Sequence, residues 1–185
     1  MNKLIFLMFV VFVLSAYSCS SSENSSSNGS GEMGEYDWTN LQYFYSEGSV
    51  PPQYYYNYSV MIDNDGKSQF WFYAAAGDTP IYKNDFTITS DQISLLSKKL
   101  VESKIFDGDI PAMQNPPIGG HSEYLKLVTV NPDPNLDQSP ILRQTPPFPT
   151  EEYKEGLESL YGVINGFIPS EYMSEAKRVK EGMSK

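Results

Sequence analysis

The fold of this 185-residue chain is decided by residues 58–73, which read YSVMIDNDGKSQFWFY. Tyr58, Val60 and Ile62 occupy alternate positions, and such alternation is typical of a half-buried β-strand. The Asp-Gly pair that ends at Gly66 predicts a tight turn, because glycine supplies the positive φ that such turns need. The aromatic run FWFY then predicts the return strand. The stretch therefore predicts a β-hairpin.

The segment before the hairpin is crowded with aromatic residues. Pro51 and Pro52 interrupt it and exclude a helix across that point. We expect a strand near 41–46, then a loop, and a second strand from about residue 54. Tyrosine and tryptophan faces bind sugar rings or peptide side chains at little entropic cost, so these rings are interpreted either as a stacking platform for a ligand or as rings that pack on the sheet. The candidate ligand-binding residues are Tyr43, Tyr45, Tyr54, Tyr55, Tyr56 and Trp71.

The chain after the hairpin predicts one more strand near 81–88 and then a helix. Residues 89–92, TSDQ, have the form of a capping box, and apolar residues at helical spacing follow, so we expect a helix over about 90–103. Residues 124–130 predict a strand, and a return strand around 139–144 completes a second hairpin.

A second helix is expected after Thr150, which is placed to cap it. Its apolar stripe follows helical spacing and consists of Tyr153, Leu157, Leu160 and Ile164. Gly166 is expected to end it in a left-handed cap, and Ser170 to begin a short last helix. These elements predict an α+β fold, a two-layer sandwich of a mainly antiparallel sheet with two amphipathic helices on one face.

The N-terminus has the layout of a secretory signal. Lys3 precedes the apolar run LIFLMFVVFVL at 4–14, which is shorter than the roughly 20 residues needed to span a bilayer. Small residues then lead to Cys19, the single cysteine. This pattern resembles the lipobox of bacterial lipoproteins. The resemblance implies removal of residues 1–18 as a signal peptide and lipidation of Cys19 by palmitate-type acyl chains, which would anchor the chain to the membrane. The alternative is a plain secretory signal with an incidental cysteine.

The layout as a whole resembles that of small lipoproteins of Gram-negative bacteria. In that group, Ser20 directly after the cysteine implies the outer membrane. Glu23 is the single acid soon after it, which leaves the periplasmic and cell-surface sides both open. Residues 19–35 are rich in Ser, Asn and Gly and predict a flexible tether, and residues 36–185 predict a single domain.

Charge and composition exclude several classes of function. The chain has 23 acidic and 13 basic residues and a net charge of −10, which argues against a nucleic-acid partner because phosphates need a basic face. One cysteine and one histidine argue against Cys-rich and His-cluster metal sites. The acidic runs at 63–66 and 133–138 depart from the spacing of a calcium loop. We therefore expect no metal and no cofactor.

The long loop at 107–122 carries the one histidine, His121, and the acids Asp107 and Asp109. Long loops of this kind are often functional, but no nucleophile motif accompanies this histidine. We expect a non-catalytic binding module for an envelope or extracellular protein or a glycan. The alternatives are an envelope hydrolase that uses the carboxylates of Asp107 and Asp109, a module that offers its Pro-rich loop to a protease as an inhibitor, or a structural role.

Overall fold

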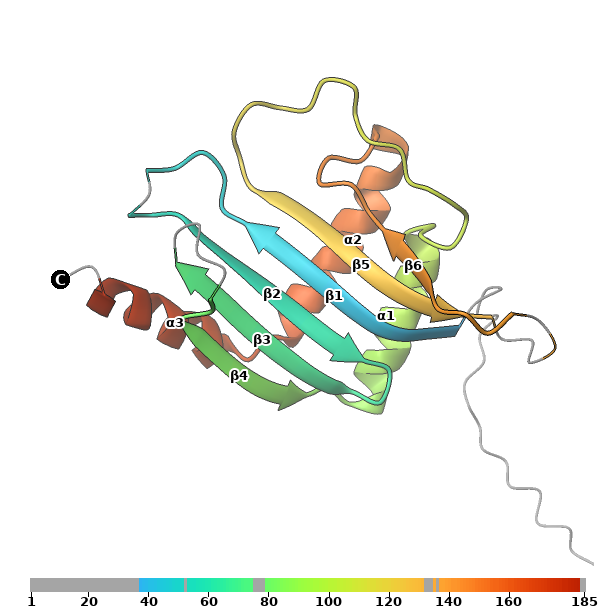
Figure 1. The fold of residues 1–185 in the computed structure, drawn as a ribbon, viewed down its shortest axis with the longest axis horizontal. Helices are drawn as coiled ribbons and strands as arrows, with labels where there is room; N and C mark the ends of the chain where they lie inside the picture. The colour runs from blue at the N-terminus through green and yellow to red at the C-terminus, as the bar shows by residue number, and fades with distance from the viewer. Residues whose placement is uncertain (1–36, 52, 75–78, 132–134, 136, 184–185) are drawn as a thin grey trace, which may run out of the picture.

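Six strands form one sheet, and three helices accompany it. The computed structural model describes residues 37–51, 53–74, 79–131, 135 and 137–183. In chain order the elements are β1 (Asp37–Ser46), β2 (Tyr56–Asp63), β3 (Lys67–Ala74), β4 (Tyr82–Thr87), α1 (Ser90–Glu102), β5 (Ser122–Val130), β6 (Ile141–Gln144), α2 (Glu151–Phe167) and α3 (Ser170–Met183). The strand order is β4-β3-β2-β1-β5-β6 (Figure 1), and every neighbouring pair is antiparallel. The predicted α+β architecture is confirmed.

The hairpin predicted at residues 58–73 is the β2–β3 pair. Val60 lies opposite Phe70, and Ile62 lies opposite Ser68. Gly66 in the turn has a φ of 90°. A Cβ at this position would come within 2.6 Å of the carbonyl oxygen of Ile88, so both the backbone conformation and the available space require glycine there.

The core lies between one face of the sheet and the helices. The strands contribute Leu41, Tyr43, Val60, Ile62, Phe70, Phe72, Leu125 and Leu127, all fully buried. Opposite them, α1 contributes Leu96 and Leu100, and α2 contributes the predicted stripe residues Leu157, Leu160 and Ile164. Figure 1 shows the helices behind the sheet, while no helix of the described chain covers its front. We call this front the open face.

The helix ends test the capping predictions individually. Thr89 and Gln92 form the predicted capping box at the start of α1. Thr150 occupies the N-cap position of α2, but its side chain makes no capping hydrogen bond. The left-handed cap at Gly166 is wrong, because α2 continues through Phe167 and ends at Ile168, which is extended with ψ at 124°. Pro169 explains this, since a residue before proline is driven out of the helical conformation.

The predicted anchor lies outside the described residues. Residues 1–18, Cys19 and the tether at 19–35 all precede β1. Within the described ranges, none of the helices combines the length and the apolar character that crossing a bilayer requires.

Candidate functional site

A hollow of about 400 Å³ lies where β1 ends and β2 begins. We call it the aromatic hollow. Its lining consists of Phe44, Tyr45, Ser46, Tyr55, Asn57, Tyr58, Ser59, Tyr73 and Tyr124. None of these residues carries a charge at neutral pH. The volume lies within the roughly 300–1,000 Å³ of small-molecule sites in proteins.

The strand register explains why Phe44, Ser59 and Tyr124 meet on the open face. Two other rings of the aromatic hollow, Tyr45 and Tyr58, belong to the helix side of the sheet. Phe44 of β1 lies opposite Ser59 of β2 on one side and opposite Tyr124 of β5 on the other. Side chains of directly opposed residues share a face, which here is the face away from the buried Tyr43. The rings of Phe44 and Tyr124 stack with centroids 4.5 Å apart and planes 10° from parallel. Lys126 Nζ lies 5.3 Å from the Phe44 ring centroid.

Two polar atoms of the open face, Ser59 Oγ and Trp71 Nε1, are buried and have no hydrogen-bond partner among the described residues. Ser59 is 2% exposed, and its hydroxyl makes no hydrogen bond to any described residue. The indole N–H of Trp71, directly opposite Ser59 on β3, is buried and equally unpaired within the described chain. Leaving such a group unsatisfied costs about 1–3 kcal/mol, so these two groups are candidates for hydrogen bonds to a bound molecule.

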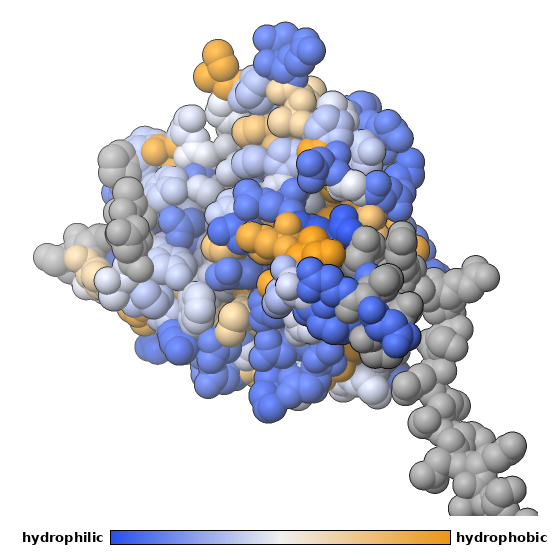
Figure 2. All heavy atoms as spheres, turned by 45° about the vertical axis from the view of Figure 1, so that its right-hand side comes forward, coloured by the Kyte–Doolittle hydropathy of each residue, from blue (hydrophilic) through white to orange (hydrophobic). Residues whose placement is uncertain are grey.

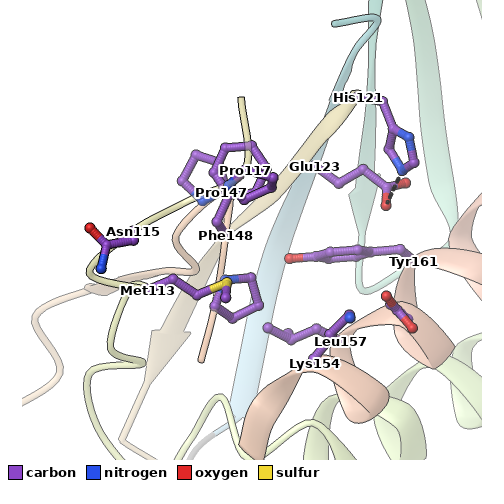
Figure 3. A pocket seen from close by; sticks show the side chains of 12 residues that line it. Met113, Asn115, Pro117, His121, Glu123, Pro147, Phe148, Lys154, Leu157 and Tyr161 are labelled. Carbon is purple, nitrogen blue, oxygen red and sulfur yellow. Dashed lines mark ion pairs between the residues drawn. The ribbon is translucent and has the colours of Figure 1, made fainter. Parts of the chain in front are cut away.

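A second hollow, of about 390 Å³, lies between the loop before β5, residues 147–149 and α2. We call it the loop hollow. It is lined by Met113, Asn115, Pro117, His121, Glu123, Pro147, Phe148, Pro149, Lys154, Leu157, Glu158 and Tyr161. Figure 3 shows apolar side chains from the Pro-rich segments on one side, and His121, Glu123 and Tyr161 on the other.

A buried hydrogen-bond network fixes the Glu123 carboxylate at the loop hollow. The Tyr58 hydroxyl donates to Asn165 Oδ1 at 2.8 Å, and Asn165 Nδ2 donates to the Tyr43 hydroxyl oxygen at 2.9 Å. The Tyr43 hydroxyl in turn donates to Glu123 Oε1. Burial raises the pKa of Tyr43, and the nearby Tyr58 and Glu123 raise it further. Tyr43 therefore stays protonated at physiological pH, and every bond of the network is directed toward the carboxylate.

His121 borders the same carboxylate. Its Nε2 lies 3.6 Å from Glu123 Oε2, and its ring stacks on Tyr45 with centroids 5.5 Å apart. The imidazole is more than half exposed. Asp107 and Asp109, the carboxylates of the hydrolase alternative, are exposed and line neither hollow.

The structure separates the six candidate ligand-binding residues onto different faces. Tyr43 is fully buried in the core, and Tyr45 and Tyr56 stack on each other, 5.9 Å apart, on the helix side of the sheet. Tyr54 projects from the loop with 64% of its surface exposed. Tyr55 lines the aromatic hollow, where its hydroxyl lies 3.0 Å from Ser46 Oγ, and Trp71 lies on the open face.

Four rings of the aromatic hollow were not among those candidates: Phe44, Tyr58, Tyr73 and Tyr124. The available signal was strand alternation, because Phe44 follows the core residue Tyr43, and Tyr124 precedes the core residue Leu125. Tyr73 lies opposite Asn57, another lining residue. Because successive side chains of a strand point to opposite faces, the open-face rings can be identified once the core residues of each strand are known.

Among the described residues, no three His, Cys, Asp or Glu side chains lie close enough together to bind a metal ion. The two hollows offer different chemistry, one neutral and aromatic, the other apolar with a fixed carboxylate.

Comparison of the chain with known protein families and with curated proteins gave no match.

Proposed function

We propose that this protein is a lipid-anchored lipoprotein of the outer membrane whose domain is a non-catalytic binding module for a neutral carbohydrate. The observation that carries the proposal is the aromatic hollow, in which the stacked rings of Phe44 and Tyr124 lie next to the buried, unpaired hydroxyl of Ser59. The ligand lies on the open face, on the side of the sheet away from the helices.

The composition of the hollow favours a sugar over other ligands. Aromatic faces pack against the apolar face of a sugar ring, while the hydroxyls of the sugar need hydrogen-bond partners. The hydroxyl of Ser59 and the amide of Asn57 offer such partners. A purely apolar ligand would leave Ser59 unpaired, and a cationic ligand would meet the Lys126 ammonium beside the Phe44 ring and no carboxylate in the lining. A neutral, hydroxyl-rich ring satisfies both constraints.

The lipid anchor rests on the N-terminal sequence. A signal-like segment ends at Cys19, and a Ser-rich tether precedes the domain. Each acyl CH₂ buried in a membrane contributes about 0.8 kcal/mol, so two or three chains on Cys19 anchor the protein stably. Metabolic labelling with palmitate tests this part separately. The wild-type chain should take up label and Cys19→Ser should not, whereas an unlabelled wild-type chain would contradict the anchor.

Carbohydrate binding is tested by calorimetry on the purified full chain with neutral hexasaccharides of the malto, cello, xylo, laminari and chito series. We expect saturable binding of at least one series and a loss of at least tenfold in affinity in Tyr124→Ala, because stacking residues dominate such sites. Tyr54→Ala is the matched control, since this exposed ring lies outside the hollow. Absence of saturable binding to every series, or equal affinity in Tyr124→Ala, would overturn the proposal.

Ser59→Ala separates binding from folding. The hydroxyl has no partner within the described chain, so its removal should leave the melting temperature unchanged or higher. The same change should weaken binding of the hexasaccharide. A variant that melts lower but binds normally would assign Ser59 to the fold rather than to the ligand.

A further inference from the structure

The loop before β5 carries a wholly exposed isoleucine, Ile118. Pro116 and Pro117 precede it, and Gly119 and Gly120, both with positive φ, follow it. Single exposed apolar residues are common on protein surfaces. Ile118 differs because it directly follows Pro117, which lines the concave, mainly apolar loop hollow.

The loop is held at both ends. At one end, Ala112 forms a β-bridge with Pro149, and the Met113 N–H donates to the Phe148 carbonyl oxygen at 2.9 Å. At the other, Gly48 packs so closely on Gly120 that a Cβ on Gly48 would overlap the Gly120 carbonyl oxygen. A loop fixed in this way loses little conformational entropy when a partner binds.

The fixed carboxylate gives the loop hollow its chemical preference. Glu123 Oε1 accepts the Tyr43 hydrogen bond, whereas Oε2 has the exposed His121 imidazole 3.6 Å away and accepts no hydrogen bond from the described residues. The Glu123 side chain is 19% exposed and lines the hollow. Glu158 adds another carboxylate to the lining, against the single ammonium of Lys154. Apolar walls around a held carboxylate suit a cationic group on an apolar stem.

We propose that the loop hollow is a docking site for an extended peptide segment of a partner protein, and that this segment inserts a lysine or arginine side chain. The inserted cation pairs with Glu123, and an apolar residue next to it in the peptide packs on Ile118. The net charge of −10 favours approach of such a basic segment. The site lies on the helix side of the sheet and is distinct from the aromatic hollow of the proposed function.

The test uses blocked pentapeptides of sequence acetyl-Gly-Leu-X-Leu-Gly-amide titrated into the ¹⁵N-labelled full chain and followed by NMR. X is arginine or lysine, with citrulline and norleucine as neutral counterparts. We expect the basic peptides to bind at least tenfold more tightly than their counterparts and to shift the amides of His121 and Glu123. Equal affinity of basic and neutral peptides, or no saturable shift, would overturn the proposal.

Variants identify the residues responsible. Glu123→Gln should abolish the tenfold preference, whereas Glu155→Gln, an exposed carboxylate on α2 outside the hollow, should retain it. Because Glu123 belongs to the buried network, Glu158→Gln is the second variant. Glu158 lines the hollow but does not belong to that network. Its replacement by glutamine should reduce the preference for basic over neutral peptides at least twofold. Retention of the full preference in both Glu123→Gln and Glu158→Gln would contradict the assignment.

Two further titrations separate a peptide partner from a free cation. Ile118→Ser should lower the affinity for the leucine-flanked basic peptides about threefold. The affinity for basic peptides with glycine in place of leucine should not change. Spermidine and arginine amide should bind at least tenfold more weakly than the leucine-flanked peptides. Equal binding of these small cations would overturn the docking of a peptide and assign the hollow to free amines.

Discussion

The hydroxyl of Tyr43, at the centre of the buried core, donates a hydrogen bond to the carboxylate of Glu123, which is 80 positions further along the chain and reaches the lining of the loop hollow. The pair joins β1 to β5 through side chains in addition to the backbone ladder. Folding of the core and orientation of the carboxylate are therefore coupled, and changes in the core should be detectable at the surface.

Replacement of Tyr43 by phenylalanine tests this coupling. The variant keeps the ring but leaves Glu123 Oε1 and Asn165 Nδ2 without their partner. We expect a loss of about 1–3 kcal/mol in the free energy of unfolding, measured by urea denaturation, because both groups are largely buried. Tyr54→Phe, on an exposed ring, should change stability by less than about 0.5 kcal/mol. Similar effects of the two changes would contradict a structural role for the Tyr43 hydroxyl.

Alkaline pH should destabilise the domain in a defined range. Burial raises the pKa of Tyr43, Tyr58 and Tyr161 above the ordinary value of 10.0. Above pH 10 the unfolded chain loses these protons while the folded chain keeps them, so fewer protons are bound in the unfolded state and stability falls as pH rises. Each group contributes at most about 1.4 kcal/mol per pH unit.

Urea melts between pH 8 and pH 11.5 measure this effect. The free energy of unfolding should be nearly constant up to about pH 9.5 and fall above pH 10. Tyr161→Phe removes one of the hydroxyls with a raised pKa, so the free energy of unfolding of this variant should fall less steeply with pH. Identical slopes for the variant and the wild type would show that Tyr161 ionises equally in both states.

Two glycines should respond to alanine in opposite directions. Gly48→Ala places a methyl group against the Gly120 carbonyl, so we expect a loss of about 1–3 kcal/mol and shifted amides in the loop before β5. Gly162 lies exposed inside α2 with open space at its Cβ position, so Gly162→Ala should raise stability by about 0.5–1 kcal/mol. Thermal melting with NMR of the loop amides distinguishes these outcomes, and an unperturbed loop in Gly48→Ala would contradict the close packing.

The helix starts provide a matched pair of threonines. Thr89 accepts a capping hydrogen bond from the Gln92 N–H, whereas Thr150 makes no such bond at the start of α2. Thr89→Ala should therefore cost about 1 kcal/mol in urea denaturation, and Thr150→Ala clearly less. A larger loss in Thr150→Ala would reverse the assignment of the two caps.

Local signals predicted the elements of the fold well. Alternation around Val60, positive φ at Gly66 and the capping box at Thr89 each depend on residues close in sequence, and the structure confirms all three. The predicted helix end at Gly166 was wrong, but its correction also depends on a residue close in sequence. Pro169, three positions later, ends the helix instead.

The candidate sites were harder to predict because they depend on pairing between distant strands. Tyr54, Tyr55 and Tyr56 are adjacent in sequence, but only Tyr56 belongs to β2, where it lies on the helix side. Tyr54 projects from the preceding loop and Tyr55 lines the aromatic hollow, so the three rings do not form one platform. The stacked pair Phe44–Tyr124 requires the register of β1 against β5, which composition does not encode locally. The loop hollow draws its lining from residues 113 to 161, so it exists only once the chain has folded.

The direction of β1 separates the two hollows from the point where the chain enters the described domain. The chain enters the described domain at Asp37, the first residue of β1. Phe44 and Tyr45 lie near the last residue of this strand, and Tyr45 is directly opposite Glu123 of β5 in the sheet. At about 3.3 Å per residue, Phe44 is roughly 23 Å along the strand from that entry point. Under the proposed attachment through residues 19–35, both hollows would therefore lie at the end of β1 opposite the attachment point. A ligand or partner would reach either hollow without passing that point.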